Sequence, residues 1–122
     1  MVTARQRYVV RRLKKAYGVV GKVAGRYVAA GYSVELNYPT RYGPVHVVAR
    51  GRGQVLAVDI VYGRGRLTAD AARSILEKAK LIKARPVLAV YGLSWSGMPE
   101  ELRGFCEESG VKLRVVGELE LK

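Results

Sequence analysis

A run of ten residues near the middle of the chain, residues 54–63, limits the fold more than any other stretch. Its sequence is QVLAVDIVYG, in which seven residues are apolar, four are β-branched and one, Asp59, is charged. Such a run is typical of a strand that is buried on both faces of a sheet. An unpaired buried carboxylate costs several kcal/mol, so Asp59 needs a cation, a hydrogen-bond donor or a ligand beside it. Because side chains alternate along a strand, Asp59 is expected to share a face with Ala57 and Val61.

The size of the chain predicts a single domain over residues 1–122, large enough to bury roughly two thirds of its unfolded surface. No apolar run is long enough to span a membrane, and no signal-peptide core follows the arginines near the N-terminus, so we expect a cytoplasmic protein. With one cysteine, Cys106, and one histidine, His46, the chain cannot form an internal disulfide or assemble a zinc site alone. Cys106 is expected in the core. The scarcity of Gln and Asn is typical of a thermophile.

Charge is distributed unevenly along the chain. The net charge is +12, and residues 1–66 hold 13 Lys and Arg against two carboxylates, Glu35 and Asp59. Residues 67–122 hold 9 Lys and Arg against 8 carboxylates. A basic half joined to a balanced half favours a surface that binds a polyanion such as nucleic acid, because each neutralised phosphate releases counterions. The alternative is a generally charged, soluble surface.

The order of the expected elements predicts an α/β sandwich with a central mixed sheet flanked by helices. Thr3 is expected to cap a helix that starts near Ala4 and extends to Ala30. Gly18, Gly21 and Gly25 interrupt this helix; they either divide it near Gly18 or let another backbone approach closely. Thr68 is expected to cap the second helix, with Lys78 on its outer side. The other expected elements are strands 32–38, 44–49 and 54–62, a hairpin loop 50–53 carrying two arginines, helix 69–84, strand 87–91, helix 99–109 and an edge strand 111–116.

Cations and aromatic rings on the basic helix and in the loops are the candidate nucleic-acid contacts, because arginine supplies a fork of donors to phosphate and aromatic rings stack on bases. Ring positions at strand ends favour single-stranded or distorted DNA over duplex. The candidates are Arg5, Arg11, Arg12, Lys15, Lys22, Arg26, Arg41, Tyr42, His46, Arg50, Arg52, Arg64, Arg66 and Trp95.

Three segments carry a resemblance to known proteins. They are YGVVGKVAGRYVAAGY at residues 17–32, NYPTRYGPVHVVA at 37–49, and LAVDIV at 56–61, followed by Gly63-Arg64. Together they resemble the bacterial YraN-type predicted nucleases and, more distantly, the archaeal Holliday junction resolvases, both in the PD-(D/E)xK superfamily. The resemblance covers residues 17–91 and implies a restriction-endonuclease-like fold. A similar element order also occurs in the catalytic domain of tRNA-splicing endonucleases.

This chain departs from the family at the residues that would hold a catalytic metal. Lys22 stands where the family has a glutamate, His46 stands where it has an aspartate, and the family's glutamate-x-lysine is replaced by Asp59-Ile60-Val61. The family's Mg²⁺ is held by two or three carboxylates, so the resemblance implies a scaffold that has lost its metal and kept its affinity for nucleic acid. Lys22 and His46 would then bind phosphate with Asp59 as counter-ion. Alternatively, Asp59 forms a core salt bridge with Lys22 or Arg64.

Three functions remain open at this point. The first is a non-catalytic, cofactor-free protein that binds single-stranded or junction DNA, rather than RNA, as a homo-oligomeric dimer or tetramer. The second is an active endonuclease. It would use Asp59 and Glu35 with Mg²⁺ like a resolvase, or Tyr42, His46 and Lys80 or Lys83 without metal like a splicing endonuclease. The third is a scaffold subunit that only assembles with a partner.

Overall fold

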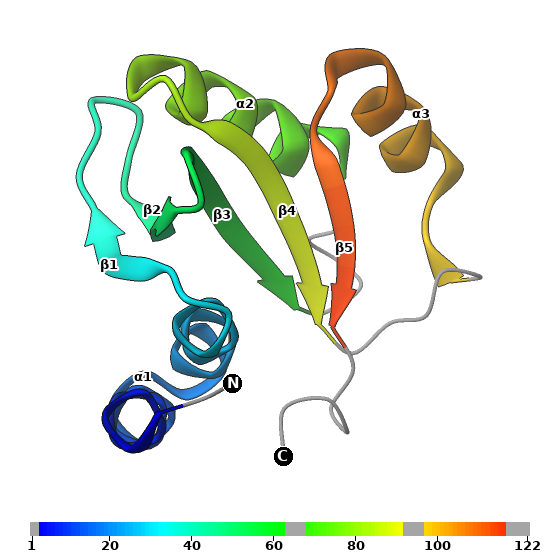
Figure 1. The fold of residues 1–122 in the computed structure, drawn as a ribbon. Coiled ribbons are helices and arrows are strands. Elements are labelled where there is room, and N and C mark those ends of the chain that lie inside the picture. Colours follow the sequence, from blue (N-terminus) through cyan, green and yellow to red (C-terminus); the bar gives the residue numbers. More distant parts are fainter. Residues whose placement is uncertain (1–2, 63–67, 92–96, 117–122) are drawn as a thin grey trace.

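A five-stranded mixed sheet forms the centre of the computed structural model, which describes residues 3–62, 68–91 and 97–116, apart from the side chains of residues 9–17 and 62 (Figure 1). The strands lie in chain order, β1-β2-β3-β4-β5. The first two pairings are antiparallel and the last two are parallel. The α/β class and the mixed sheet expected from the sequence are therefore confirmed. The strands are β1 (Ser33–Tyr38), β2 (Val45–Gly51), β3 (Gln54–Tyr62), β4 (Arg85–Tyr91) and β5 (Lys112–Val116).

Helix α1 (Ala4–Ala29) begins as expected and is broken once. Thr3 forms a capping box with Gln6, whose backbone N–H donates to Thr3 Oγ1 while the Gln6 side chain accepts from the Thr3 N–H. Gly18 has φ 59° and ψ −128°, values outside the helical region. Of the two alternatives left open for the glycines, the structure shows a division at Gly18, in a conformation that a residue with a Cβ adopts only with strain.

The hairpin between β2 and β3 is tighter than expected. Arg52 and Gly53 both have positive φ, 52° and 74°, as a two-residue turn that matches the strand twist requires. Arg50 was expected in this loop, but it lies inside β2, opposite Ser33, and forms an ion pair with Glu35. The tip of the hairpin therefore carries one arginine rather than two.

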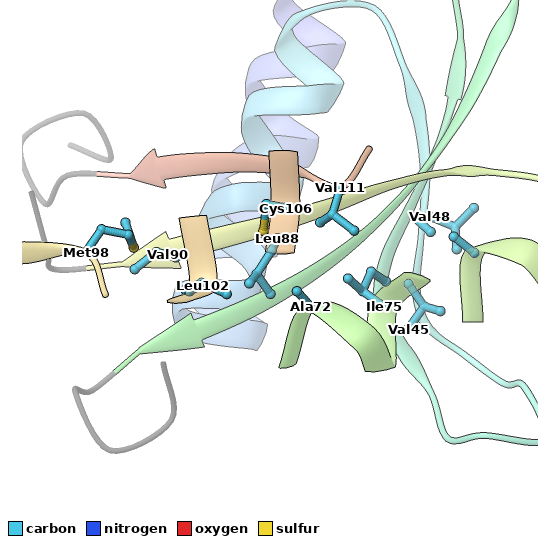
Figure 2. Packing of buried hydrophobic residues seen from close by; sticks show 12 residues of the cluster. Val45, Val48, Ala72, Ile75, Leu88, Val90, Met98, Leu102, Cys106 and Val111 are labelled. Atoms are coloured by element: carbon cyan, nitrogen blue, oxygen red, sulfur yellow. The ribbon is translucent and has the colours of Figure 1, made fainter. Parts of the chain in front are cut away.

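Helices α2 (Ala69–Leu81) and α3 (Glu100–Ser109) cover the other face of the sheet from α1 (Figure 1). Figure 2 shows ten labelled residues of their shared core, among them Ile75, Leu88, Leu102 and Cys106. The α1 face has a second core that includes Ala24, Val58 and Val87. Cys106 is buried as expected, and burial raises the pKa of its thiol.

Two expectations about α2 were wrong, and one about its cap fails in detail. The helix ends at Leu81 rather than at residue 84, because Lys83 turns to φ 54° and the Ala84 N–H donates to the Ala79 carbonyl. Lys78, expected outside, is buried. Thr68 is the N-cap residue, but its side chain makes no capping hydrogen bond.

At the edge of the sheet, β5 lies where the sequence predicted, and Gly110 ends α3 in a left-handed conformation. Among the described residues, no helix combines the length and apolar character needed to cross a membrane.

Candidate functional site

Asp59 lies in β3 on the face covered by α2. Its neighbours on alternate positions, Ala57 and Val61, both belong to the core beneath α2, as alternation along a strand requires. Asp59 is 8% exposed, so its charge must be compensated within the protein.

Lys78 of α2 supplies that compensation. Its Nζ lies 2.9 Å from Asp59 Oδ2 and 2.9 Å from the carbonyl oxygen of Pro44, and Lys78 is also only 8% exposed. The sequence-based alternatives for the partner of Asp59 were Lys22 and Arg64. Lys78 takes the place expected for Lys22, and Arg64 is outside the described residues. The ammonium thus joins α2 to β3 and to the residue that precedes β2.

His46 completes the cluster from β2. The His46 backbone N–H donates to Asp59 Oδ1 over 3.1 Å, and the Ile60 N–H donates to His46 Nδ1 over 2.9 Å. The regular pairing of β2 with β3 runs only as far as Val47 opposite Val58, so these two bonds continue the strand contact through side chains. Because Nδ1 accepts a hydrogen bond from a backbone amide, Nδ1 carries no proton, and the proton of the neutral ring is on Nε2.

A cavity of about 280 Å³ adjoins this cluster, and Val20, His46, Asp59 and Ser74 are among the residues that line it. The residues present do not fit Mg²⁺. Both carboxylate oxygens of Asp59 already accept hydrogen bonds, one from Lys78 and one from His46. Nowhere in the part of the chain that the structure describes do three or more His, Cys, Asp or Glu residues gather closely enough to hold a metal. A hard dication requires several oxygen ligands, whereas this cluster offers a single carboxylate whose charge is already paired with Lys78.

No hydrogen bond or ion pair among the described residues joins the side chains expected to act together in an active endonuclease. Glu35 is on β1 and pairs with Arg50, while Lys80 pairs with Glu77 over 3.9 Å. Tyr42 is exposed in the turn between β1 and β2. Lys83 lies beside Gly51 and Gly53, at the opposite end of β2 from His46. Neither proposed set of catalytic groups is assembled by the contacts of the described residues.

The candidate nucleic-acid contacts are spread over α1 and the β1–β2 region. Arg5, Arg41 and Arg52 are exposed, whereas Lys22 and Arg26 are half-buried. Three of the described candidate arginines lie over tyrosine rings: Arg41 over Tyr42 at 5.2 Å, Arg50 over Tyr38 at 5.6 Å and Arg52 over Tyr32 at 6.0 Å. Such contacts hold the guanidinium planes in place. Arg11, Arg12 and Lys15 lie in α1 with side chains outside the description, and Arg64, Arg66 and Trp95 lie outside the described residues.

The sequence does not single out four cations that the structure places in the buried pair or around a cavity. Lys78 was missed because lysine is usually exposed, although its position between Ile75 and Ala79 follows the apolar stripe of α2. Arg85, Lys112 and Arg114 line one cavity on the α1 face of the sheet. Their signal was present in β5, where Lys112 and Arg114 alternate with the apolar residues Leu113 and Val115.

Comparisons of the chain with models of known protein families, with curated proteins and with solved structures find no match in any of the three. The fold and the site define an α/β protein with a five-stranded mixed sheet and a buried Asp59–Lys78 pair.

Proposed function

We propose that this protein binds nucleic acid, DNA rather than RNA, without cleaving it. The observation that carries the proposal concerns the two carboxylates among residues 1–66. Glu35 pairs with Arg50 and Asp59 pairs with Lys78, so both are already committed within the fold. Against these two carboxylates, the same half of the sequence holds 13 Lys and Arg. An excess of positive charge of this kind is best satisfied by phosphates, with release of counterions.

The state of Asp59 supports the part of the proposal that concerns cleavage. A metal-dependent nuclease needs carboxylate oxygens that are free to hold the ion that activates water. Here the cluster holds one carboxylate, which accepts from Lys78 at Oδ2 and from the His46 amide at Oδ1. The pair therefore acts as a structural tie between α2 and the sheet.

The scaffold in this proposal is a nuclease-like one. The order of helix, three-stranded meander, helix and strand supports it, as does the resemblance of residues 17–91 to the PD-(D/E)xK superfamily. Loss of the metal ligands on such a scaffold leaves the binding surface and removes the reaction. Single-stranded and junction DNA are the proposed targets, and the protein is proposed to bind them as a dimer or tetramer.

The test is an incubation of the purified protein with labelled single-stranded, duplex and four-way-junction DNA, with and without Mg²⁺ or Mn²⁺. We expect retarded complexes at low salt, tightest with single-stranded or junction DNA, and no cleavage products. Static light scattering of the same sample gives the oligomeric state.

Two outcomes would overturn the proposal in favour of the other functions. Cleavage that is lost in a folded Asp59→Ala variant would show an active endonuclease. No retention of any DNA at about 50 mM salt, where electrostatic binding is strong, would favour a scaffold subunit.

A further inference from the structure

Helix α1 covers only part of its face of the sheet. It packs against β1 and β2, while α2 and α3 both lie on the opposite face (Figure 1). Beyond the C-terminal turn of α1, at the start of β4 and β5, the structure has a cavity of about 640 Å³. This volume lies within the range of pockets that hold small organic ligands.

This cavity forms a groove on the α1 face of the sheet, and cations from three elements surround it. Arg85, Lys112 and Arg114 come from β4 and β5, and Arg26 comes from α1. The strand register explains why the three strand cations meet. Residues paired across neighbouring strands point to the same face of the sheet, and the partners of these cations belong to the core on the α1 face or pack against it. The pairs are Arg85 with Leu56, Lys112 with Val87 and Arg114 with Ala89. No carboxylate occurs among the described residues that line the groove. The three strand cations, gathered in a wall without a carboxylate, favour an anionic ligand.

Aromatic contacts fix the geometry of the groove wall. The rings of Tyr27 and Tyr32 meet edge to face with centroids 5.7 Å apart, and Gln54 Nε2 donates to the Tyr32 hydroxyl over 2.8 Å. The guanidinium of Arg114 lies 5.7 Å from the centroid of the Tyr27 ring. A guanidinium held over a ring presents its other side as a flat cationic surface, and bases of single strands stack on such surfaces.

We propose that this groove holds one nucleotide unit of a single-stranded nucleic acid. Arg85 and Lys112, both exposed, contact the phosphate, and the base lies against Arg114. This inference rests on the proposed nucleic-acid function and assigns that function a site on the α1 face of the sheet. A double helix keeps its bases stacked and paired, so it cannot place a base in the groove without the free-energy cost of unstacking.

The experiment compares two double variants by fluorescence anisotropy with a fluorescein-labelled oligothymidylate and with a duplex of equal length. The groove variant carries Arg85→Gln and Lys112→Gln. The matched control carries Lys80→Gln and Arg103→Gln, two exposed positions on α2 and α3 that lower the net charge equally. All four positions are exposed, and equal urea midpoints for the two variants show that both remain folded.

We expect the groove variant to raise the Kd for the single strand about tenfold or more, and the control by a much smaller factor. The loss on duplex should be smaller than the loss on the single strand. Swapping the two cations, as Arg85→Lys with Lys112→Arg, should retain binding. If the wild-type protein binds the strand but the groove and control variants weaken it equally, the groove proposal is wrong and the general function stands. If the wild-type protein binds neither probe, both are wrong.

Discussion

Lys78 Nζ lies 2.9 Å from Asp59 Oδ2, and both side chains are almost completely buried between α2 and the sheet. The same ammonium donates to the carbonyl of Pro44, so one side chain ties α2, β3 and the start of β2 together. Because an apolar core surrounds the pair, each charge depends on the other for its stability.

Replacement of Lys78 by Met is therefore expected to lower the free energy of unfolding by about 3–5 kcal/mol, because it leaves Asp59 as an uncompensated buried charge. Urea denaturation measures this loss. Lys80→Met, on the exposed side of the same helix, is the control, and it should change stability by less than about 1 kcal/mol. Equal effects of the two substitutions would contradict the structural role of the pair.

A second prediction concerns the imidazole of His46. His46→Leu removes the acceptor for the Ile60 N–H, which should cost about 1–3 kcal/mol and speed hydrogen exchange at that amide. His46→Asn places a carbonyl oxygen close to the position of Nδ1 and should preserve most of the protection. Exchange measured by NMR distinguishes the two variants. An Ile60 amide that is equally protected in wild type and His46→Leu would show that the bond to Nδ1 is unimportant.

The fold was more predictable from sequence than the cluster around Asp59. The strand predicted from the run at residues 54–63 depends on local periodicity, which is visible in the sequence. The glycines of the first helix leave open whether the helix divides near Gly18 or lets another backbone approach. The partner of Asp59 depends on how α2 rotates against the sheet. The sequence requires a cation, a hydrogen-bond donor or a ligand beside Asp59, and the nearby chain and the family pattern point to Arg64 and Lys22 rather than to Lys78 on the next helix.

The kink in α1 gives a third prediction. Gly18→Ala should destabilise the protein by about 1–3 kcal/mol, because an alanine strains at φ 59° and ψ −128°, although open space surrounds the position. Gly104→Ala is the control, since Gly104 lies in α3 with open space where a Cβ would stand, and helix propensity should make this change stabilising by up to about 1 kcal/mol. Thermal or urea unfolding of both variants provides the comparison. A neutral Gly18→Ala substitution would show that α1 can run straight.

The thiol of Cys106 gives a pH-dependent prediction. Burial raises its pKa, so the thiol ionises at lower pH in the unfolded chain than in the folded protein. The thiol of an unfolded chain has a pKa of about 8.5. The contribution of the buried thiol to stability is complete below that pH and decreases as the pH rises from there towards the pKa of the folded state. The stability advantage of wild type over Cys106→Ala should therefore shrink between about pH 7.5 and pH 10. An advantage that is constant or grows over this interval, measured by urea unfolding, would place the thiol in contact with water.

The groove on the α1 face shows the same limit of sequence analysis. Alternation in β5 indicates that Lys112 and Arg114 share a face, but only the register with β4 brings Arg85 next to them. Their assembly also requires that α1 stop short of these strands. That depends on the placement of a helix at the other end of the sequence, which no local pattern encodes.

The salt dependence of nucleic-acid affinity tests the central claim most directly. Anisotropy titrations of the wild-type protein with a labelled single-stranded oligonucleotide, repeated between about 50 and 200 mM salt, give the slope of log K against log salt. We predict a straight line with a steep negative slope, equivalent to several phosphate contacts at roughly 0.7 units each for a single strand. A slope near zero, or no binding at the lowest salt, would contradict the proposal that the excess cations of residues 1–66 and the groove bind polynucleotides.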